Sequence, residues 1–320
     1  MHILLVRMEG SVFNRSIWEG FSRAFRALGH EVTEVDDTDV PDPAALPSLP
    51  DLLFAVHGGT VPTETIALYR ELSIRTAVYL LDEPYEVERS TSWARAYDWV
   101  FTVDRMTVSI HAARSESAFL PLAYDDTCFR QEGKSYASDV LVLGSPFEHR
   151  LQLLAPLRRK WGRCITWVGR GWRPFCPDGK HVDQFVTPEI CARFYRGAEI
   201  VINIHRDSFW SHWGETNRGG IVATHLNPRF WEASACGSFQ LCSYRADIET
   251  FAPRAVSFET SEQLAEQLDG WWEDEAGRLR IAEDTKRRVM PHTYGVRAQT
   301  VISLLEGGSV PEAALLKLSL

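Results

Sequence analysis

The sequence contains no apolar run long enough to cross a membrane, and its apolar start at residues 1–6 is too short for a signal peptide. Its six cysteines form no Cys-x-x-Cys pair and no zinc-type spacing with histidine, so we expect reduced thiols, no metal site and a cytoplasmic location. Lys and Arg number 34 against 43 Asp and Glu, a formal charge of −9, which argues against nucleic acid as the main partner.

The chain does contain a repeated strand–helix pattern. Residues 2–6 are continuously apolar, as in a strand covered on both faces, and an apolar helical stripe follows over residues 17–28. The pattern restarts after the polar segment 125–138. This predicts an α/β protein with two Rossmann-like domains, at residues 1–134 and 135–297, facing across a cleft. Residues 298–320 are expected to form a helix that returns toward the first domain.

The predicted strands of the first domain each end in a polar or glycine-containing loop. Ligands of parallel sheets bind beyond the carboxyl ends of the strands, so these loops are expected to line one site, which Glu9 and Gly10 border. His57 and Asp82 are the strongest candidates, because each is the first polar residue after a long apolar strand. The loops are residues 57–59, 82–84, 104–105 and 123–125. The alternative is that they are plain turns, and for Asp104 this alternative is favoured.

Residues 227–241, NPRFWEASACGSFQL, predict a helix followed by a strand. Asn227 suits the N-cap, Pro228 the first helical position and Gly237 the position after the helix. The N-terminus of such a helix can hold a phosphate. Arg229 and Glu232 are three apart and share a face, which leaves two interpretations open. They form an ion pair, or Arg229 lies near a phosphate while Glu232 accepts hydrogen bonds from ribose hydroxyls.

The same stretch resembles the donor-binding segment of GT-B glycosyltransferases of the CgeB-like group. Further segments resemble that group in the same order: DVLVLGSPFEHR at 139–150, FYRGAEIVINIHR at 194–206 and PHTYGVR at 291–297. In the first half, LLDEP, YDWVFTVD and FLPLAYD resemble the group's Asp-x-Pro loop, aromatic strand and Leu-Pro turn. The resemblance therefore spans nearly the whole chain.

The resemblance implies a GT-B fold with a nucleotide sugar on the second domain and the acceptor on the first. It implies a hexosyltransferase with a UDP-sugar as the expected donor and a small-molecule, glycan or protein acceptor. Metal independence is expected, because no loop suited to the diphosphate carries an Asp-x-Asp motif. Glu232 matches the ribose-contacting glutamate of the related family four. The sugar-contacting glutamate eight positions earlier is replaced by Thr224, which leaves the donor sugar and the stereochemistry open.

The resemblance also suggests roles for other residues of the second domain. Gly144 and Ser145 would let the backbone approach the diphosphate, and Arg150 would supply charge to the leaving group unless it is merely solvated. Gly171 and Trp172 would border the base, with Trp172 stacked on it. These assignments are expectations from the resemblance.

Two strand-end residues and one loop complete the candidates. His205 and Arg206 end a strand and are expected to point into the site, a structural histidine being the alternative for His205. On the first domain Asp82 is the first candidate for acceptor contact or general base, and His57 the second. The loop 207–220 contains Trp210 and Trp213 and suits a lid, a sugar platform or an ordinary surface loop.

Three other functions remain open at this point. The missing glutamate at Thr224 favours a non-catalytic nucleotide- or glycan-binding member of the fold. A nucleotide-sugar epimerase would use a similar two-domain fold. A phage-like DNA glucosyltransferase is disfavoured by the acidic balance.

Overall fold

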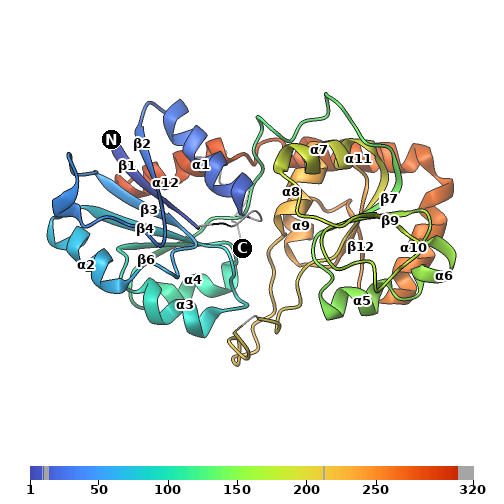
Figure 1. The fold of residues 1–320 in the computed structure, drawn as a ribbon, viewed down its shortest axis with the longest axis horizontal. Coiled ribbons are helices and arrows are strands. Elements are labelled where there is room, and N and C mark those ends of the chain that lie inside the picture. The colour runs from blue at the N-terminus through green and yellow to red at the C-terminus, as the bar shows by residue number, and fades with distance from the viewer. Residues whose placement is uncertain (9, 11–13, 212, 309–320) are drawn as a thin grey trace. The chain divides into compact units, whose positions relative to one another are not determined.

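The computed structural model describes residues 1–8, 10, 14–211 and 213–308, so the predicted role of Glu9 and the end of the predicted C-terminal helix lie outside the described residues. The chain forms two compact units. Unit 1 comprises Met1–Leu122, Ser208–His225 and Tyr294–Leu320, and unit 2 comprises Ala123–Asp207 and Leu226–Thr293. Each unit is built on its own parallel sheet (Figure 1).

The sheet of unit 1 has six strands in the order β2-β1-β3-β4-β5-β6. All neighbours are parallel, so all carboxyl ends meet at one edge. The central strand β3 is wholly buried, as its continuous apolar run requires. The strands are β1 (His2–Arg7), β2 (Glu31–Asp36), β3 (Leu52–Val56), β4 (Arg75–Leu80), β5 (Trp99–Thr102) and β6 (Glu116–Phe119).

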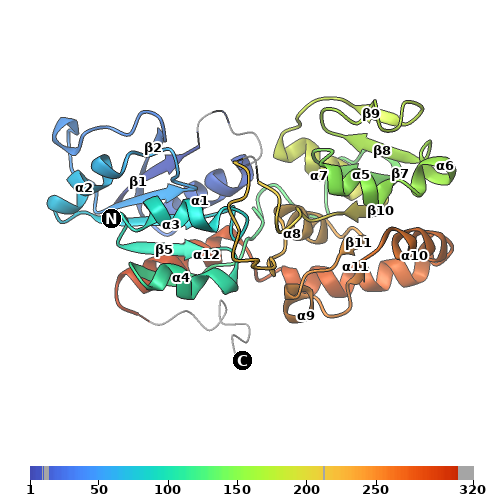
Figure 2. The same cartoon turned by 90° about the horizontal axis from the view of Figure 1, so that it is seen from below.

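Helices cover both faces of this sheet (Figures 1 and 2). α1 (Arg15–Ala27) and α12 (Tyr294–Leu305) lie on one face, and α2 (Thr63–Glu71), α3 (Val87–Ala94) and α4 (Val108–Ala112) lie on the other. Short 3₁₀ turns occur at η1 (Pro43–Ala45) and η2 (Arg105–Thr107). Gly20 permits the close packing of α1 on α12, because a Cβ there would overlap the ring of Tyr294. Arg297 fixes α12 by donating to the carbonyl oxygen of Pro121 at 2.7 Å.

The sheet of unit 2 also has six parallel strands, in the order β12-β11-β10-β7-β8-β9. The strands β7 and β10 pair in its middle. From this pair the strand order runs outward in opposite directions, to β8 and β9 on one side and to β11 and β12 on the other. In such an open parallel sheet, ligands bind at the carboxyl ends of the two central strands β7 and β10. The strands are β7 (Ser138–Leu143), β8 (Ile165–Val168), β9 (Lys180–Val182), β10 (Ala198–Asn203), β11 (Gln240–Ser243) and β12 (Val256–Phe258).

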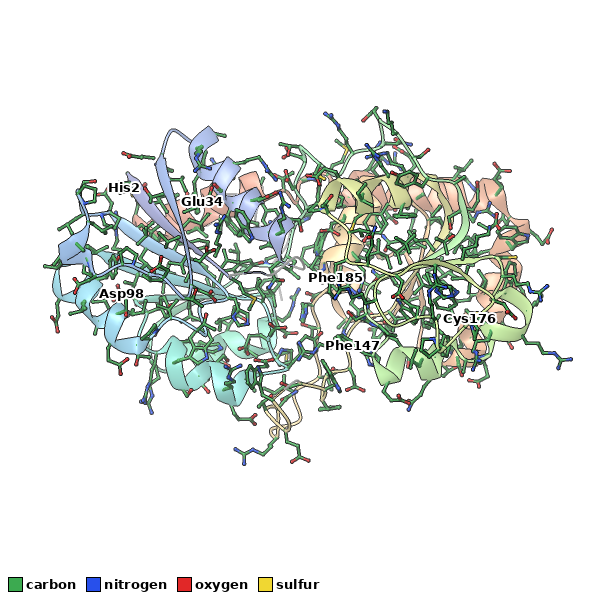
Figure 3. The ribbon with its side chains drawn as sticks, viewed as in Figure 1. His2, Glu34, Asp98, Phe147, Cys176 and Phe185 are labelled. Atoms are coloured by element: carbon green, nitrogen blue, oxygen red, sulfur yellow. The ribbon has the colours of Figure 1, made fainter. Side chains whose placement is uncertain are left out.

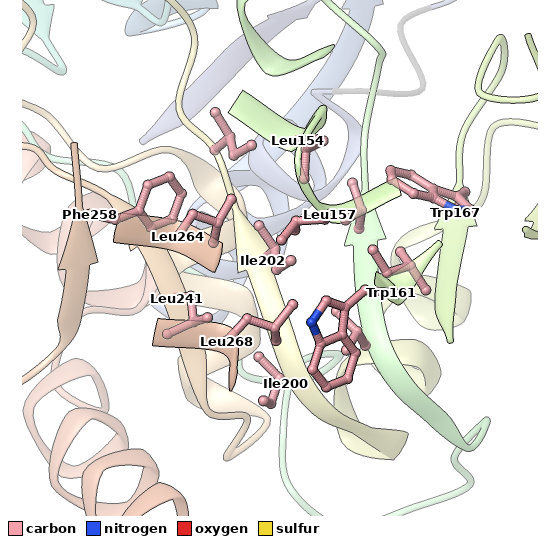
Figure 4. Close-up of a cluster of buried hydrophobic side chains, with 14 of the residues drawn as sticks. Leu154, Leu157, Trp161, Trp167, Ile200, Ile202, Leu241, Phe258, Leu264 and Leu268 are labelled. Carbon is pink, nitrogen blue, oxygen red and sulfur yellow. The ribbon is translucent and has the colours of Figure 1, made fainter. Parts of the chain in front are cut away.

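A core of aliphatic and tryptophan side chains packs one face of this sheet against helices (Figure 4). The helices of unit 2 are α5 (Glu148–Leu154), α6 (Leu157–Trp161), α7 (Pro188–Gly197), α8 (Pro228–Ala235), α9 (Asp247–Phe251), α10 (Ser261–Glu273) and α11 (Glu275–Val289). Leu154 ends α5, Leu157 begins α6, and Leu264 and Leu268 lie on α10. All four are at most 1% exposed.

The predicted α/β class with two Rossmann-like units is confirmed. In the part of the chain that the structure describes, no helix is long and apolar enough to span a bilayer.

Candidate functional site

The carboxyl end of β7 in unit 2 runs directly into a glycine that two arginines approach. Gly144 has φ +128°, a conformation that side chains rarely adopt. A Cβ on Gly144 would overlap the guanidinium of Arg229 and lie 3.4 Å from Nη1 of Arg150. The turn requires glycine, because a side chain at position 144 would occupy the space of the two arginine side chains.

Arg229, the second residue of α8, is fixed across the ends of two strands. Its Nη2 donates to the carbonyl oxygen of Ile204 at 2.9 Å and its Nη1 to that of Leu143 at 3.3 Å. Its Nε donates to Oδ1 of Asn203 at 3.3 Å. A guanidinium held by three such acceptors keeps its orientation, so less side-chain entropy remains to be lost when an anion binds.

The buried side-chain amides of Asn203, Asn227 and Gln240 form a hydrogen-bond network next to Arg229. Asn227 caps α8 as predicted, because Oδ1 accepts from the backbone N–H of Phe230 at 3.0 Å. Its Nδ2 donates to Asn203 at 2.9 Å, and Asn203 in turn donates to Gln240 at 3.2 Å. The helix N-terminus, the end of β10 and the start of β11 are therefore joined by satisfied hydrogen bonds, the arrangement that locks a site in place.

Arg150 is buried in α5 and not on a solvated helix flank. Its side chain is 6% exposed, its Nη1 donates to the carbonyl oxygen of Ser145 at 2.8 Å, and its guanidinium stacks 4.6 Å from the ring centre of Phe147. The alternative of a merely solvated arginine is therefore wrong. Burial of this charge beside Gly144 adds a second cation to the same strand end.

Glu232 is 7% exposed and lies on α8, which packs against α7. Burial, together with the negative charge of Glu232, raises the pKa of Tyr195 and of Cys191 on α7. Arg229 acts on the same two groups in the opposite direction. Glu232 lies one turn further along α8 than Arg229, and its contact with a ribose stays a prediction.

His205 has the position of a structural histidine. It is 2% exposed, and both its backbone N–H and its Nδ1 lie within 3.0 Å of Oγ of Ser243. Its carbonyl oxygen pairs with Nε2 of His149 at 2.7 Å. The expectation that His205 points into an open site is wrong. The half-buried Arg206 follows it, and its carbonyl oxygen accepts from Arg245.

Trp172 requires a correction as well. Its ring is 1% exposed and packs 4.9 Å from Trp167, so no ring face is left for a base. Its Nε1 instead donates to the carbonyl oxygen of Gly144 at 2.7 Å, which fixes the glycine turn. Gly171 has φ +91° and donates its N–H to Oδ1 of Asp183 at 3.0 Å.

Phe185, unlike Trp172, has an exposed ring that could contact a base, although the sequence did not predict it as a candidate. Phe185 follows β9, is 40% exposed and carries the guanidinium of Arg170 4.9 Å from its ring centre. In the view of Figure 3, Phe185 and Phe147 lie at the same end of unit 2. The exposure of Phe185 is not visible in the sequence, which is why the sequence did not predict it as a candidate.

In unit 1 the two predicted residues His57 and Asp82 meet. His57 follows β3 with φ +79°, Asp82 follows β4, and Nε2 of His57 lies 3.2 Å from Oδ2 of Asp82. Burial lowers the pKa of His57, but the hydrogen bond to Asp82 and the charges of Asp82 and Glu86 outweigh it, so the pKa is raised above 6.5. The side chain of Asp82 is 33% exposed and that of His57 13%, so Asp82 is the more accessible member.

The pair lines a small hollow of unit 1, about 10 Å³ in volume, whose wall carries further charges. Glu86 and Arg89 form an ion pair of 3.3 Å at its wall. Glu83, fully buried at 1%, pairs with His111 at 3.5 Å and accepts from Ser90. The Glu83–His111 pair was not predicted from the sequence, because its two residues come from separate elements. The hollow is lined by His57, Leu80, Leu81, Asp82, Glu83, Glu86, Arg89, Ser90 and Trp93.

Asp104, at the end of β5, serves a different purpose. It is fully buried, and its carboxylate accepts from the backbone N–H of Thr224 at 2.7 Å and lies 3.1 Å from Nδ1 of His225. Burial alone would raise its pKa, but His225 and the backbone donors lower it. Asp104 therefore anchors the segment Ser208–His225 within unit 1.

Comparisons with known proteins agree with this arrangement. Residues 150–303 match the family described as glycosyl transferase-like. Spore protein CgeB of Bacillus subtilis (strain 168) is 25% identical over 224 residues, which cover 65% of this chain and 70% of CgeB.

Solved structures share the fold over nearly the whole chain. An α-glucosyltransferase in complex with UDP-glucose and DNA containing an abasic site aligns with a TM-score of 0.60 at 14% identity, over 92% of this chain and 96% of its own. Anabaena Alr3699/HepE in complex with UDP aligns with a TM-score of 0.58 at 12% identity, over 96% of this chain and 100% of its own. The family match over residues 150–303, the similarity to CgeB and the shared fold together show that this chain is similar to CgeB-like glycosyltransferases of the GT-B fold.

Proposed function

We propose that the protein transfers a hexosyl group from a UDP-sugar to a hydroxyl acceptor. The observation that carries the proposal is the convergence of Arg150 and Arg229 on Gly144 at the carboxyl end of β7. Two fixed guanidiniums beside the first turn of α8 suit a diphosphate, because charge-assisted hydrogen bonds and the helix N-terminus both favour an anion. UDP is the nucleotide held by the similar Anabaena protein, which supports uridine as the base.

The reaction forms a bond between the anomeric carbon and the acceptor oxygen and breaks the bond between that carbon and the diphosphate. Negative charge grows on the leaving nucleoside diphosphate, where Arg150 and Arg229 stabilise it. The proton of the acceptor hydroxyl passes to the His57–Asp82 pair of unit 1. The accessible carboxylate of Asp82 is the receiving group, and His57 orients it from 3.2 Å.

The proposal is tested with a panel of nucleotides and nucleotide sugars. We expect UDP and one UDP-sugar to raise the melting temperature, since a ligand at 100 times its Kd adds about 2.7 kcal/mol to the free energy of unfolding. The matching UDP-sugar should also release UDP slowly by hydrolysis. ADP and GDP serve as controls. The absence of stabilisation by every nucleotide would refute the donor site.

Removal of divalent cations is expected to leave activity unchanged. The cations Arg150 and Arg229 already occupy the strand end where a diphosphate-bound metal would otherwise neutralise charge. UDP release should therefore proceed at the same rate in EDTA and in millimolar Mg²⁺ or Mn²⁺. A loss of more than about tenfold in EDTA, which corresponds to about 1.4 kcal/mol, would contradict metal independence.

Substitution of Glu232 separates its two interpretations. If Glu232 accepts hydrogen bonds from the ribose, Glu232→Ala should weaken UDP binding by about 10- to 100-fold, because hydrogen bonds to a charged group contribute roughly 1.5–3 kcal/mol. Deoxy-UDP analogues should then bind wild type and variant alike. Unchanged UDP affinity with a lowered melting temperature would show that Glu232 is structural. Calorimetry with UDP measures both quantities on the same samples.

A non-catalytic nucleotide-binding protein is the second candidate, and Thr224 favours it. At the position of the family-four glutamate, the backbone N–H and Oγ1 of Thr224 are directed to Asp104. If UDP raises the melting temperature but no UDP-sugar is consumed or released with any acceptor, this candidate replaces the first. Conversion of one UDP-sugar into its epimer without UDP release would instead indicate an epimerase.

A further inference from the structure

Three apolar side chains of the described part of segment 208–225 in unit 1 are largely exposed. Phe209 is 58% exposed, Trp213 61% and Val222 62%. Soluble proteins seldom leave large apolar side chains clustered in water unless the surface binds something. We call these three residues the apolar platform.

Polar groups inside the segment hold this arrangement. Asn217 is 7% exposed, and its side chain donates to the carbonyl oxygens of Ser208 and Ile221 at 2.9 and 2.8 Å. The N–H of Ala223 donates to Oγ of Ser208 at 3.0 Å. Phe209 directly follows Ser208 and Val222 directly precedes Ala223, the two residues that this last hydrogen bond joins. Hydrogen bonds of the buried Asn217 and Ser208 side chains therefore hold the backbone that carries the platform.

The segment is also tied to the body of unit 1. Oγ1 of Thr216 donates to the carbonyl oxygen of Tyr85 at 2.8 Å, and the N–H of Arg218 donates to Glu88 on α3 at 2.7 Å. Asp104 holds its far end through Thr224. The platform is therefore presented on a fixed frame, as a binding surface requires.

The platform adjoins the hollow that contains the His57–Asp82 pair. The guanidinium of Arg89 lies 3.8 Å from the ring centre of Trp213, and Arg89 lines that hollow. Oγ of Ser211 donates to Glu86, which lines it too, at 3.3 Å. These contacts link the indole of Trp213 to the Arg89–Glu86 ion pair and to the hollow that contains Asp82, all within unit 1, although Glu86 itself is only 7% exposed.

We propose that this surface binds a neutral oligosaccharide as the acceptor, with its reacting hydroxyl at Asp82 and the next sugar units on Trp213 and Phe209. The proposal rests on the proposed function and names its acceptor class. Aromatic faces cover the apolar C–H face of a sugar ring, while the carboxylate of Glu86 and the guanidinium of Arg89 exchange hydrogen bonds with its hydroxyls.

The charge of the surface favours a neutral sugar over a membrane. Within the described part of segment 208–225, Glu215 and Arg218 balance each other, and the adjacent α3 region contributes Glu86 and Glu88 beside Arg89. Segments that dock on lipid surfaces combine exposed aromatic residues with an excess of Lys and Arg. That excess is missing from these residues.

The test is calorimetric binding of neutral oligosaccharides to the full chain, using malto-, cello-, chito- and galacto-oligosaccharides. We expect at least one series to bind wild type, Trp213→Ala to weaken it by about tenfold, and Trp213→Phe to retain most of it. Leu68→Ala, which removes a 39% exposed apolar side chain from α2 of the same unit, is the matched control and should bind like wild type.

Each other outcome counts against the proposal. Binding by no series, or equal losses in Trp213→Ala and Leu68→Ala, would overturn it. Cosedimentation of wild type with phosphatidylcholine–phosphatidylglycerol vesicles that Trp213→Ala abolishes would assign the platform to a lipid surface. The rise in melting temperature with UDP is measured on the same variants. If UDP does not raise the melting temperature of the wild type, the proposed function is refuted. If UDP raises it but no oligosaccharide binds, only the proposed acceptor is refuted.

Discussion

Arg229→Ala is expected to weaken UDP binding by at least tenfold and to lower kcat/KM by about 10²- to 10³-fold. Arg229 is one of two guanidiniums at Gly144, and the loss of one donor to a developing anion typically costs about 2.7–4 kcal/mol. Arg229→Lys should recover only part of this loss, because an ammonium cannot reproduce the fork that also binds the carbonyl oxygens of Leu143 and Ile204.

The measurement is UDP titration and initial-rate kinetics on variants whose melting temperatures are known. Arg163→Ala, which removes an exposed arginine from the same unit, controls for the general loss of positive charge. Arg229 also fixes strand ends, so some loss of stability accompanies its removal. If Arg229→Ala remains folded and binds UDP as tightly as Arg163→Ala, the diphosphate does not bind at Gly144.

Asp82→Asn is expected to lower kcat by about 10²- to 10⁴-fold and to leave UDP binding unchanged, because a positioned acid–base group contributes about that much. The substitution replaces one carboxylate oxygen by nitrogen, so the shape of the hollow is kept. His57→Gln should cause a smaller loss, since His57 orients Asp82 from 3.2 Å and is the less exposed of the two.

The pair also predicts a pH dependence. Burial lowers the pKa of His57, but its bond to Asp82 and nearby negative charge raise it above 6.5 overall. The rate should therefore rise with pH as the pair loses its proton, with an apparent pKa above 6.5 that belongs to the pair. The stability that the pair contributes is fully present below pH 6.5 and is lost as pH rises through the raised pKa.

Asp82→Asn removes the partner that raises the pKa of His57, so NMR titration should show the pKa of His57 at a lower value in this variant. Thr91→Ala on α3, outside the residues that line the hollow, is the control for both measurements. A pKa of His57 that does not respond to Asp82→Asn would show that the two groups are not coupled. A rate that falls with rising pH would exclude their role as proton acceptor.

Local patterns in the sequence were sufficient for most of the strand–helix order. The apolar run 52–56 is β3 residue for residue, because a strand covered on both faces needs an uninterrupted apolar sequence. Asn227, Pro228 and Gly237 marked both ends of α8, because these signals act within one helical turn. Lys180–Val182 and Val256–Phe258 were not predicted as strands, because three residues carry no periodicity.

The sequence by itself determined the α/β class, the resemblance to CgeB and the residue types at the strand ends, since each depends on neighbours along the chain. Tertiary structure decided which of those residues lie next to one another. It joined His57 to Asp82 and brought Arg150 and Arg229 to Gly144, while it buried Trp172 and His205. It also turned Trp213 outward beside Arg89. The physical reason is that burial and hydrogen bonding between distant segments depend on packing, which local patterns do not encode.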